Sequence, residues 1–186
     1  MNININEIKN GMTIIIDGKL CLIEEFQHVK PGKGSAFMKM KLRNLRTGAL
    51  VEDTYNTNIK IERARVDRLP MQYLYVDGDN YVFMNTETYD QMELPSEKLT
   101  EQIKFLKEGM EVTIIVYEGE ILGIDLPEKV EYEVVETTEA VKGNTTNNAM
   151  KDATIETGYV VKVPLFIAQG EKIIISTKDG KYASRA

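Results

Sequence analysis

The sequence predicts an all-β fold made of three small β-barrels in a row. Over residues 1–65, short apolar-rich runs alternate with turn signals about every ten residues, and no helical periodicity interrupts them. This pattern is typical of small barrels. The chain has 186 residues, and a small barrel needs only about 60. The length therefore allows one large domain or two to three small ones; we expect three barrels, with one short helix in the middle barrel.

Charge is distributed unevenly along the chain. Residues 1–66 carry 11 Lys and Arg against 7 Asp and Glu, a net charge of +4. Residues 67–128 carry 4 against 14, a net charge of −10, and residues 129–186 carry 8 of each. We expect domains at 1–65, 66–127 and 128–186, of which the first suits RNA and the second is acidic.

In the first domain, the expected strands span residues 13–16, 20–29, 35–45 and 50–55. Asp17-Gly18 and Arg46-Thr47-Gly48 supply turns between them, because glycine accepts a positive φ and aspartate favours turns. The regular spacing of strands and turns predicts a small barrel.

In the middle domain, the expected strands include residues 72–76, 81–84, 112–117 and 121–126. The segments 77–80 and 118–120 are the turns of two hairpins. Between the hairpins, Ser96 or Thr100 is expected to cap a short helix that Gly109 ends. Its apolar residues share one face: Leu99, Ile103 and Leu106. Short strands interrupted by one helix fit an OB-fold.

In the third domain, the expected strands span residues 131–136, 159–163, 172–177 and 181–184, with a turn at Lys178-Asp179-Gly180. The polar run Thr137–Asp152 has no apolar face to bury. We therefore expect a long mobile loop there.

The most informative stretch is Phe26–Met40, FQHVKPGKGSAFMKM, which we call the finger. Pro31-Gly32 favours a type II turn across Lys30–Lys33, and Lys33 then lies at the tip with glycine on both sides. No acidic residue occurs from 27 to 49, whereas six cations do: Lys30, Lys33, Lys39, Lys41, Arg43 and Arg46. The sequence predicts a positively charged hairpin.

Groups that could support catalysis are scarce. The single histidine, His28, and the single cysteine, Cys21, are seven residues apart. In a regular strand this offset places them about 23 Å apart and on opposite faces, so they cannot form a nucleophile–base pair. Asp77-Gly78-Asp79 is explained as a turn, and Gly32-Lys33-Gly34-Ser35 lacks the earlier glycine of a phosphate-binding loop. We expect no catalytic residue, no metal and no cofactor, and hence a binding protein.

The sequence also indicates a compartment. One cysteine excludes an internal disulfide and fits a reducing environment. The first residues, MNININEIKNGM, lack a basic region followed by an apolar core, so no signal peptide is expected. Apolar runs such as Val112–Tyr117 are too short to cross a bilayer. We expect a cytoplasmic protein that binds no membrane.

Five blocks of the sequence resemble one family. HVKPGKGSAF, residues 28–37, resembles the modified-lysine loop of bacterial elongation factor P. The same family is resembled, in order, by MQYLYVDGDNYVFMNTETYDQMELP, IKFLKEGMEV, ETGYVVKVPLFIAQGEKI and STKDGKYASRA. The resemblance implies an SH3-like (KOW-like) barrel over 1–65, followed by OB-folds over 66–127 and 128–186.

The resemblance also implies a function. Members of the family bind the ribosome beside the peptidyl-tRNA and promote peptide-bond formation at consecutive prolines. Their loop lysine, usually lengthened by a modifying enzyme, reaches the CCA end of the tRNA and corresponds to Lys33. The other implied loop contacts are His28, Lys30, Pro31, Gly32, Gly34, Ser35 and Ala36. The context of Lys33 resembles members with an aminopentanol-type extension, while β-lysine or a bare lysine stay open, and we expect a monomer.

Further contacts are expected outside the loop. Arg43 and Arg46 are candidates for RNA phosphates, and Tyr182 and Arg185 are candidates for contacts with the tRNA. The family carries a Gly-Asp-Thr loop that faces the exit-site codon region. Here it reads Gly143-Asn144-Thr145, and asparagine can still hydrogen-bond bases and phosphates.

Other functions remain alternatives. A paralogue of elongation factor P with a different stall specificity would share all of these features. A general single-stranded RNA-binding OB protein should have basic grooves and stacking aromatic residues, which the acidic middle domain disfavours. An enzyme is the least favoured, because no acid–base or nucleophilic cluster is evident.

Overall fold

The computed structural model describes residues 1–140 and 149–186. Within them the chain forms β-sheets of six, five and five strands and three short 3-10 helices, which confirms the all-β prediction. None of the helices in these residues is long and apolar enough to span a membrane. The chain forms two compact units: Met1–Arg68 with Ile115–Gly123, and Leu69–Ile114 with Ile124–Ala186. The finer division at 1–65, 66–127 and 128–186 stays a prediction.

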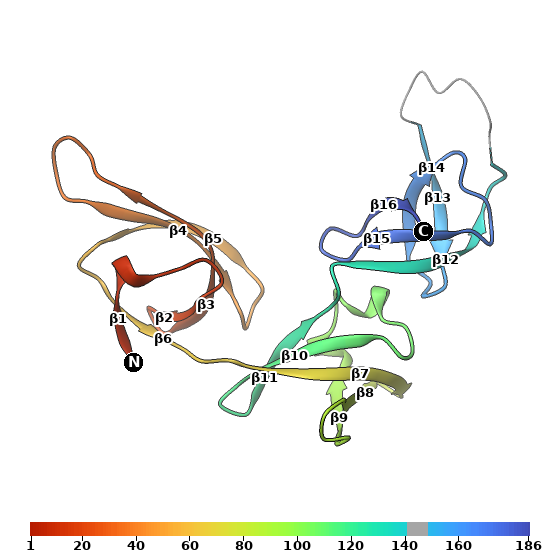
Figure 1. The fold of residues 1–186 in the computed structure, drawn as a ribbon, viewed down its shortest axis with the longest axis horizontal. Coiled ribbons are helices and arrows are strands. Elements are labelled where there is room, and N and C mark those ends of the chain that lie inside the picture. Colours follow the sequence, from red (N-terminus) through yellow and green to blue (C-terminus); the bar gives the residue numbers. More distant parts are fainter. Residues whose placement is uncertain (141–148) are drawn as a thin grey trace. The chain divides into compact units, whose positions relative to one another are not determined.

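The first sheet has the strand order β1-β6-β2-β3-β4-β5 and curls around an apolar core (Figure 1). Its elements are β1 (Asn2–Asn4), η1 (Ile5–Glu7), β2 (Thr13–Ile16), β3 (Lys19–Val29), β4 (Phe37–Asn44), β5 (Leu50–Asn56) and β6 (Lys60–Arg63). The core consists mainly of isoleucine and methionine side chains, among them Ile5, Ile14, Ile23, Met38, Met40 and Ile61. Burying one such side chain contributes about 1.5–3 kcal/mol.

The turn between β2 and β3 lies where the sequence predicts it. Asp17 and Gly18 have φ values of 50° and 72°, and two positive values are what a type I′ turn requires. Ile16 lies opposite Lys19 across this turn. Because the twist of a type I′ turn matches that of the strands, the turn also sets their register.

The second sheet has the strand order β11-β10-β7-β8-β9. Its strands are β7 (Asp67–Asp77), β8 (Asn80–Asn85), β9 (Gln91–Pro95), β10 (Glu111–Tyr117) and β11 (Glu120–Asp125). Tyr73 and Phe83 are buried, and their ring centroids are 5.5 Å apart. Tilted aromatic pairs at this distance contribute about 0.5–1.5 kcal/mol beyond the area they bury.

The helix expected in the middle domain takes the form of two 3-10 helices, η2 (Ser96–Lys98) and η3 (Ile103–Phe105). Neither has a side-chain cap, so the prediction that Ser96 or Thr100 caps a helix is wrong. Leu99 and Leu106 are buried and Ile103 is half-buried. Two single turns bury these residues without a continuous helical face, and 3-10 geometry is favoured in such short pieces.

The third sheet has the strand order β14-β13-β12-β15-β16. Its strands are β12 (Lys129–Thr137), β13 (Met150–Ile155), β14 (Val160–Pro164), β15 (Lys172–Ser176) and β16 (Lys181–Arg185). The predicted loop Thr137–Asp152 is therefore too long at both ends, because β12 ends at Thr137 and β13 begins at Met150. Lys151 explains the error at the second end: it is buried, and its Nζ donates to the carbonyl of Thr138 at 2.6 Å. Residues 141–148 of the predicted loop lie outside the described residues.

Contacts between the second and third sheets lie within the second compact unit. The hydroxyl of Tyr132, which is fully buried, donates to the carbonyl of Phe105 at 2.6 Å. The rings of Phe105 and Tyr159 meet edge to face at 5.1 Å. Thr157 Oγ1 donates to the carbonyl of Lys104 at 2.6 Å. The segment around η3 is therefore held to the third sheet by both aromatic packing and hydrogen bonds.

Tyr132→Phe is expected to destabilise the second unit by about 1–2 kcal/mol, because it leaves the buried Phe105 carbonyl without its donor. Burial, with a smaller contribution from Glu156, raises the pKa of Tyr132. The neutral hydroxyl thus stabilises the fold in full below the ordinary tyrosine pKa of about 10, and this stabilisation is lost as the pH rises further. Urea unfolding at neutral pH and above pH 10 measures both effects.

The control is Tyr89→Phe, since Tyr89 is 72% exposed. This change should alter the free energy of unfolding by less than about 0.5 kcal/mol. Equal stability of the Tyr132 and Tyr89 variants would contradict the role assigned to the Tyr132 hydroxyl.

Candidate functional site

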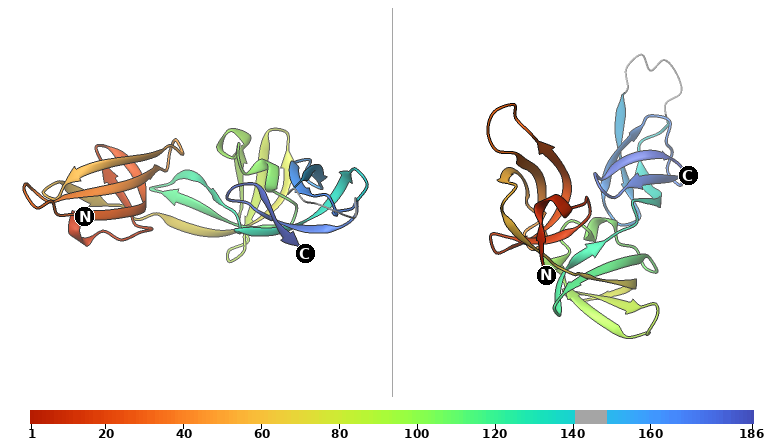
Figure 2. Two further views of the ribbon diagram at one scale, coloured as in Figure 1. Left: turned by 90° about the horizontal axis from the view of Figure 1, so that it is seen from above. Right: turned by 60° about the vertical axis from the view of Figure 1, so that its left-hand side comes forward.

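The finger, Phe26–Met40, consists of the ends of β3 and β4 and the loop between them. The two strands are paired as far as Val29 and Phe37, and β4 is also paired with β5 over most of its length. Figures 1 and 2 show the loop extending beyond the rest of the first sheet. A hydrogen-bonded stem with an unpaired end provides a stiff base and an accessible tip.

The tip differs from the predicted turn. A type II turn across Lys30–Lys33 requires a positive φ at Gly32, but Gly32 has none, and the positive φ, 107°, belongs to Gly34. The type II turn is therefore wrong. The reason lies in the length of the loop: seven residues, Lys30–Ala36, separate the strands, so Pro31-Gly32 does not have to reverse the chain by itself.

The structure brings the predicted loop residues together on one accessible surface. His28, Lys30, Pro31, Gly32, Lys33, Gly34 and Ser35 are exposed, and Ala36 is half-buried. Across the described part of the chain, no carboxylate lies within ion-pair distance of Lys30 or Lys33. Two unpaired ammonium groups therefore face solvent at the tip. The contacts assigned to these residues stay a prediction.

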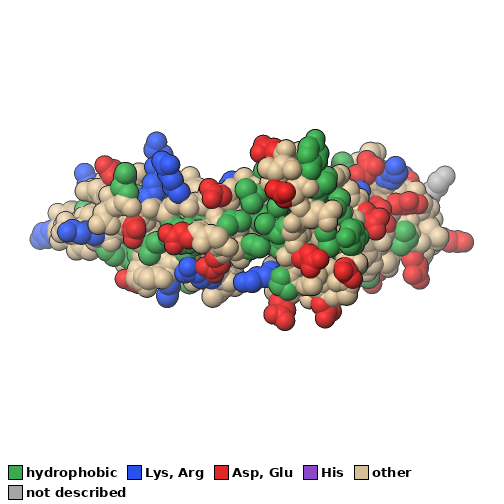
Figure 3. All heavy atoms as spheres, turned by 90° about the horizontal axis from the view of Figure 1, so that it is seen from below, with side chains coloured by type: hydrophobic (Ala, Val, Ile, Leu, Met, Phe, Trp, Pro, Cys, Tyr) green, Lys and Arg blue, Asp and Glu red, His purple; other side chains and the backbone are tan. Residues whose placement is uncertain are grey.

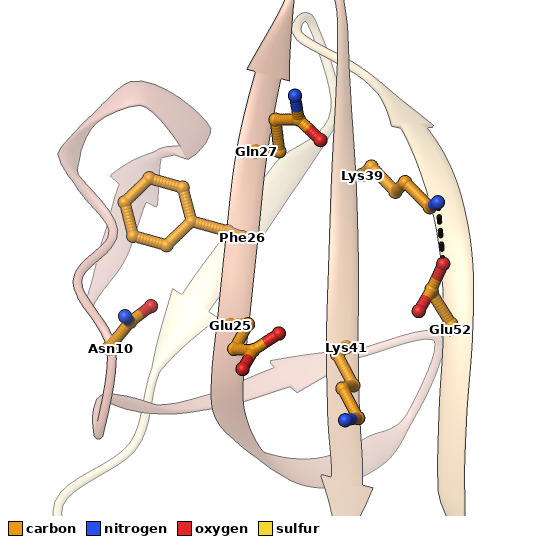
Figure 4. A pocket seen from close by; sticks show the side chains of 7 residues that line it. All are labelled: Asn10, Glu25, Phe26, Gln27, Lys39, Lys41 and Glu52. Atoms are coloured by element: carbon orange, nitrogen blue, oxygen red, sulfur yellow. Dashed lines mark ion pairs between the residues drawn. The ribbon is translucent and has the colours of Figure 1, made fainter.

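Below the tip, the stem is more nearly neutral. A groove of about 530 Å³ runs along it, lined by Asn10, Glu25, Phe26, Gln27, Lys39, Lys41 and Glu52 (Figure 4). Lys39 Nζ lies 2.7 Å from Glu52 Oε1, and the hydrogen bond from Lys39 lowers the pKa of the Glu52 carboxyl. Glu25 lies directly opposite Lys41 in the strand register. The predicted charge of the stem is thus largely offset by carboxylates from neighbouring strands.

The two arginines predicted to meet RNA have partners within the chain. Arg43 Nε donates to Glu24 Oε1 at 2.7 Å. Arg46 Nη2 lies 3.3 Å from Glu120 Oε2. Their roles as RNA contacts stay a prediction, but both guanidinium groups are already engaged.

The relation between Cys21 and His28 is not the one that strict alternation predicts. The β3–β4 register shifts between Ile23 and Glu25, so β3 contains a β-bulge. After the bulge His28 lies opposite the core residue Met38, which places it on the same face as Cys21; the predicted opposite faces are wrong. The two residues are still seven positions apart. Cys21 is buried, and burial raises the pKa of its thiol, which disfavours the reactive thiolate.

Two of the contacts predicted in the third domain, Tyr182 and Arg185, lie in the described residues. Tyr182 is half-buried, and burial raises the pKa of its hydroxyl. The Arg185 guanidinium pairs with Glu171 and lies 5.0 Å from the centre of the Phe166 ring. Gly143, Asn144 and Thr145 lie outside the described residues. The roles of all five in recognition stay predictions.

Two features of the site were not predicted from the sequence. One is the bulge at Glu24, and the other is the exposed ring of Phe26, which projects to the same side of β3 as Asn10 in Figure 4. The adjacent carboxylates Glu24 and Glu25 give a weak signal for the first, because an alternating strand would place them on opposite faces. In residues 1–140 and 149–186, no three His, Cys, Asp or Glu side chains are grouped so as to hold a metal ion.

The surface charge follows the distribution seen along the sequence. On the face shown in Figure 3, Lys and Arg side chains gather on the N-terminal part of the chain, and Asp and Glu predominate elsewhere. The finger belongs to this cationic part. An exposed cationic tip of this kind suits contact with phosphates.

Family models match nearly the whole chain. The model described as "Elongation factor P (EF-P) KOW-like domain" matches residues 4–61. "Elongation factor P (EF-P) OB domain" matches residues 66–124, and "Elongation factor P, C-terminal" matches residues 130–185. The three matches follow one another without overlap.

Solved structures add a second likeness. The eukaryotic translation initiation factor 5A from Methanococcus jannaschii is 31% identical over 68% of this chain and 94% of its own, with a TM-score of 0.52. A translation initiation factor eIF-5A family protein from Naegleria fowleri is 23% identical over 68% of this chain and 98% of its own, with a TM-score of 0.50. At 23% identity, the likeness to the Naegleria fowleri protein concerns the fold alone.

Proposed function

Because the chain belongs to the elongation factor P family, we propose that it binds the ribosome beside the peptidyl-tRNA and promotes peptide-bond formation at consecutive prolines. The family comprises ribosome-associated translation factors. The action at consecutive prolines is supported by the tip of the finger, where Lys30 and Lys33 are exposed and have no carboxylate partner in the described residues.

Lys33 is the residue that acts at the tRNA. Its ammonium is a compact charge on a flexible side chain, and Lys33 is exposed between two glycines, of which Gly32 would have no atom within 4 Å of an added Cβ. Phosphates of the CCA end attract such a charge. His28, Lys30 and Ser35 shape the loop that presents it.

The factor acts by positioning the substrates. Proline is a rigid secondary amine, so consecutive prolines hold the peptidyl ester away from the geometry of attack. A tip that restores alignment lowers the barrier entropically, and orientation of reactants is worth up to about 7–11 kcal/mol in favourable systems. The chemical step belongs to the ribosome, which is why the factor itself needs no acid–base pair.

A lysine-modifying enzyme acts on Lys33 and lengthens its reach. The protein works as a monomer in the cytoplasm. Its division into an SH3-like domain over 1–65 and OB domains over 66–127 and 128–186 lets the first domain meet the tRNA acceptor end while the acidic second domain avoids phosphates.

The test is synthesis of a short peptide containing three consecutive prolines on purified ribosomes, with the protein isolated from its own cells. Added protein should raise the rate on the proline template at least about tenfold and leave a proline-free template unchanged. The competing function, general binding of single-stranded RNA, predicts affinity for oligonucleotides in the absence of ribosomes and no template-specific effect. That second pattern would overturn the proposal.

A further inference from the structure

The direction of the finger is set at one irregular position in β3. Ile23 lies opposite Leu42 and Glu25 lies opposite Lys41, so Glu24 is left without a partner residue in β4. A bulge of this kind bends its strand and increases the local twist. It also changes which residues lie on the face of the sheet that carries Met38 and Leu42: Ile23 shares that face before the bulge, and His28, although exposed, shares it after the bulge.

Arg43 is held at this bulge by two interactions. Its Nε donates to Glu24 Oε1 at 2.7 Å, and its Nη1 donates to the carbonyl of Gly48 at 3.3 Å. Gly48 belongs to the turn between β4 and β5, which is closed by its N–H donating to the carbonyl of Asn44 at 2.8 Å. One guanidinium therefore ties the bulged residue of β3 to the turn that follows β4.

We propose that Arg43 and Glu24 are positioning residues that pin the bulge and thereby aim Lys33. The inference rests on the proposed function of Lys33. Strand pairing alone specifies the register of this part of β3 weakly. Residues 25–28 are all exposed, so a slip of β3 by one residue beyond Glu24 would move their side chains to the other face of the sheet without exposing any buried side chain among them. A fixed link at the bulge removes that freedom.

The same contacts distinguish Arg43 from the cations of the tip. The Arg43 side chain forms a neutral pair with Glu24, and both side chains are partly shielded, with 41% and 28% exposed. Binding a phosphate would require breaking that pair. Lys30 and Lys33, by contrast, have no partner to give up within the described residues.

The experiment is a double-mutant cycle in the proline-template assay, with Glu24→Leu, Arg43→Met and the combined variant. Each single change should lower the maximal rate at saturating protein about tenfold or more, because small misplacements of a reacting group are costly. The protein concentration at half-saturation should change less than about threefold. The double variant should be no worse than either single one, as expected for two residues acting through one contact.

Glu131→Leu is the control, since it breaks the exposed Lys172–Glu131 pair of the third sheet and touches neither the finger nor the bulge; it should behave as wild type. Thermal unfolding within about 3 °C of wild type shows that the variants fold. If Glu24→Leu fails to fold, Arg43→Met alone tests the proposal through the same two quantities.

An RNA contact by Arg43 predicts a different result: Glu24→Leu would then bind as well as wild type or better, while Arg43→Met would raise the half-saturating concentration. That outcome, or additive losses in the double variant, overturns the positioning role. Lys33→Ala is assayed in parallel. If Lys33→Ala and Glu24→Leu both keep full activity, the proposed function fails. If Lys33→Ala is inactive while Glu24→Leu is active, only the positioning role fails.

Discussion

Lys33→Ala is expected to abolish stimulation of peptide-bond formation at consecutive prolines, with a loss of at least about tenfold in rate on a triple-proline template. The tip residue is exposed, so the free energy of unfolding should change by less than about 0.5 kcal/mol. The measurement pairs the ribosome assay with urea unfolding of the same preparation. Loss of function without loss of stability is the expected signature of a contact residue.

Lys60→Ala is the control for this experiment. Lys60 is also an exposed lysine of the first sheet, but it lies in β6, outside the finger. This variant should retain the wild-type rate. If Lys33→Ala retained it too, Lys33 could not be the residue of the finger that acts on the tRNA.

Gly180→Ala is expected to destabilise the second compact unit by about 2–4 kcal/mol. Gly180 is buried and has a φ of 73°, a backbone conformation that costs a residue with a Cβ about 1–2 kcal/mol. The added Cβ would lie 2.7 Å from the Tyr159 hydroxyl oxygen and 3.4 Å from Phe105 Cζ. Overpacking of a filled site costs a further 1–3 kcal/mol or so, and here it displaces the ring that joins the third sheet to η3.

Gly170→Ala separates the two contributions. Gly170 has a similar φ of 88°, but a Cβ there would meet no atom within 4 Å. It should therefore lose only the backbone contribution, about 1–2 kcal/mol. Denaturant unfolding of both variants measures the difference. Equal losses would show that Tyr159 moves aside at little cost, and that the contact with Phe105 is not tightly packed.

Several local features follow from nearby residues alone. Asp17-Gly18 forms the predicted turn because both residues tolerate a positive φ, a preference that needs no distant partner. The exposure of Lys33 follows in the same way from a polar, glycine-rich segment between two apolar-rich strands. The blocks that resemble elongation factor P run through the chain in order, and for that reason the family was evident before the fold was known.

Other features depend on residues far apart in the sequence. Alternation of apolar and polar residues predicts a strand but not a bulge. One extra residue leaves this alternation almost unchanged in the sequence, yet every side chain of the strand beyond it moves to the opposite face of the sheet. Arg43 and Glu24 are 19 residues apart, and Arg46 and Glu120 are 74 apart. Their pairing depends on strand register and chain path, so from the sequence these arginines looked like free cations.

By itself, therefore, the sequence determined the all-β class, the family and the identity of the exposed lysine at the tip, because each of these depends on local pattern and residue type. Only the tertiary structure decided the conformation of the loop at the tip, the face of the sheet on which each β3 residue beyond Glu24 lies, and which Lys and Arg side chains pair with carboxylates. Those properties arise from hydrogen bonds and ion pairs between strands, and such contacts exist only once the sheet has formed.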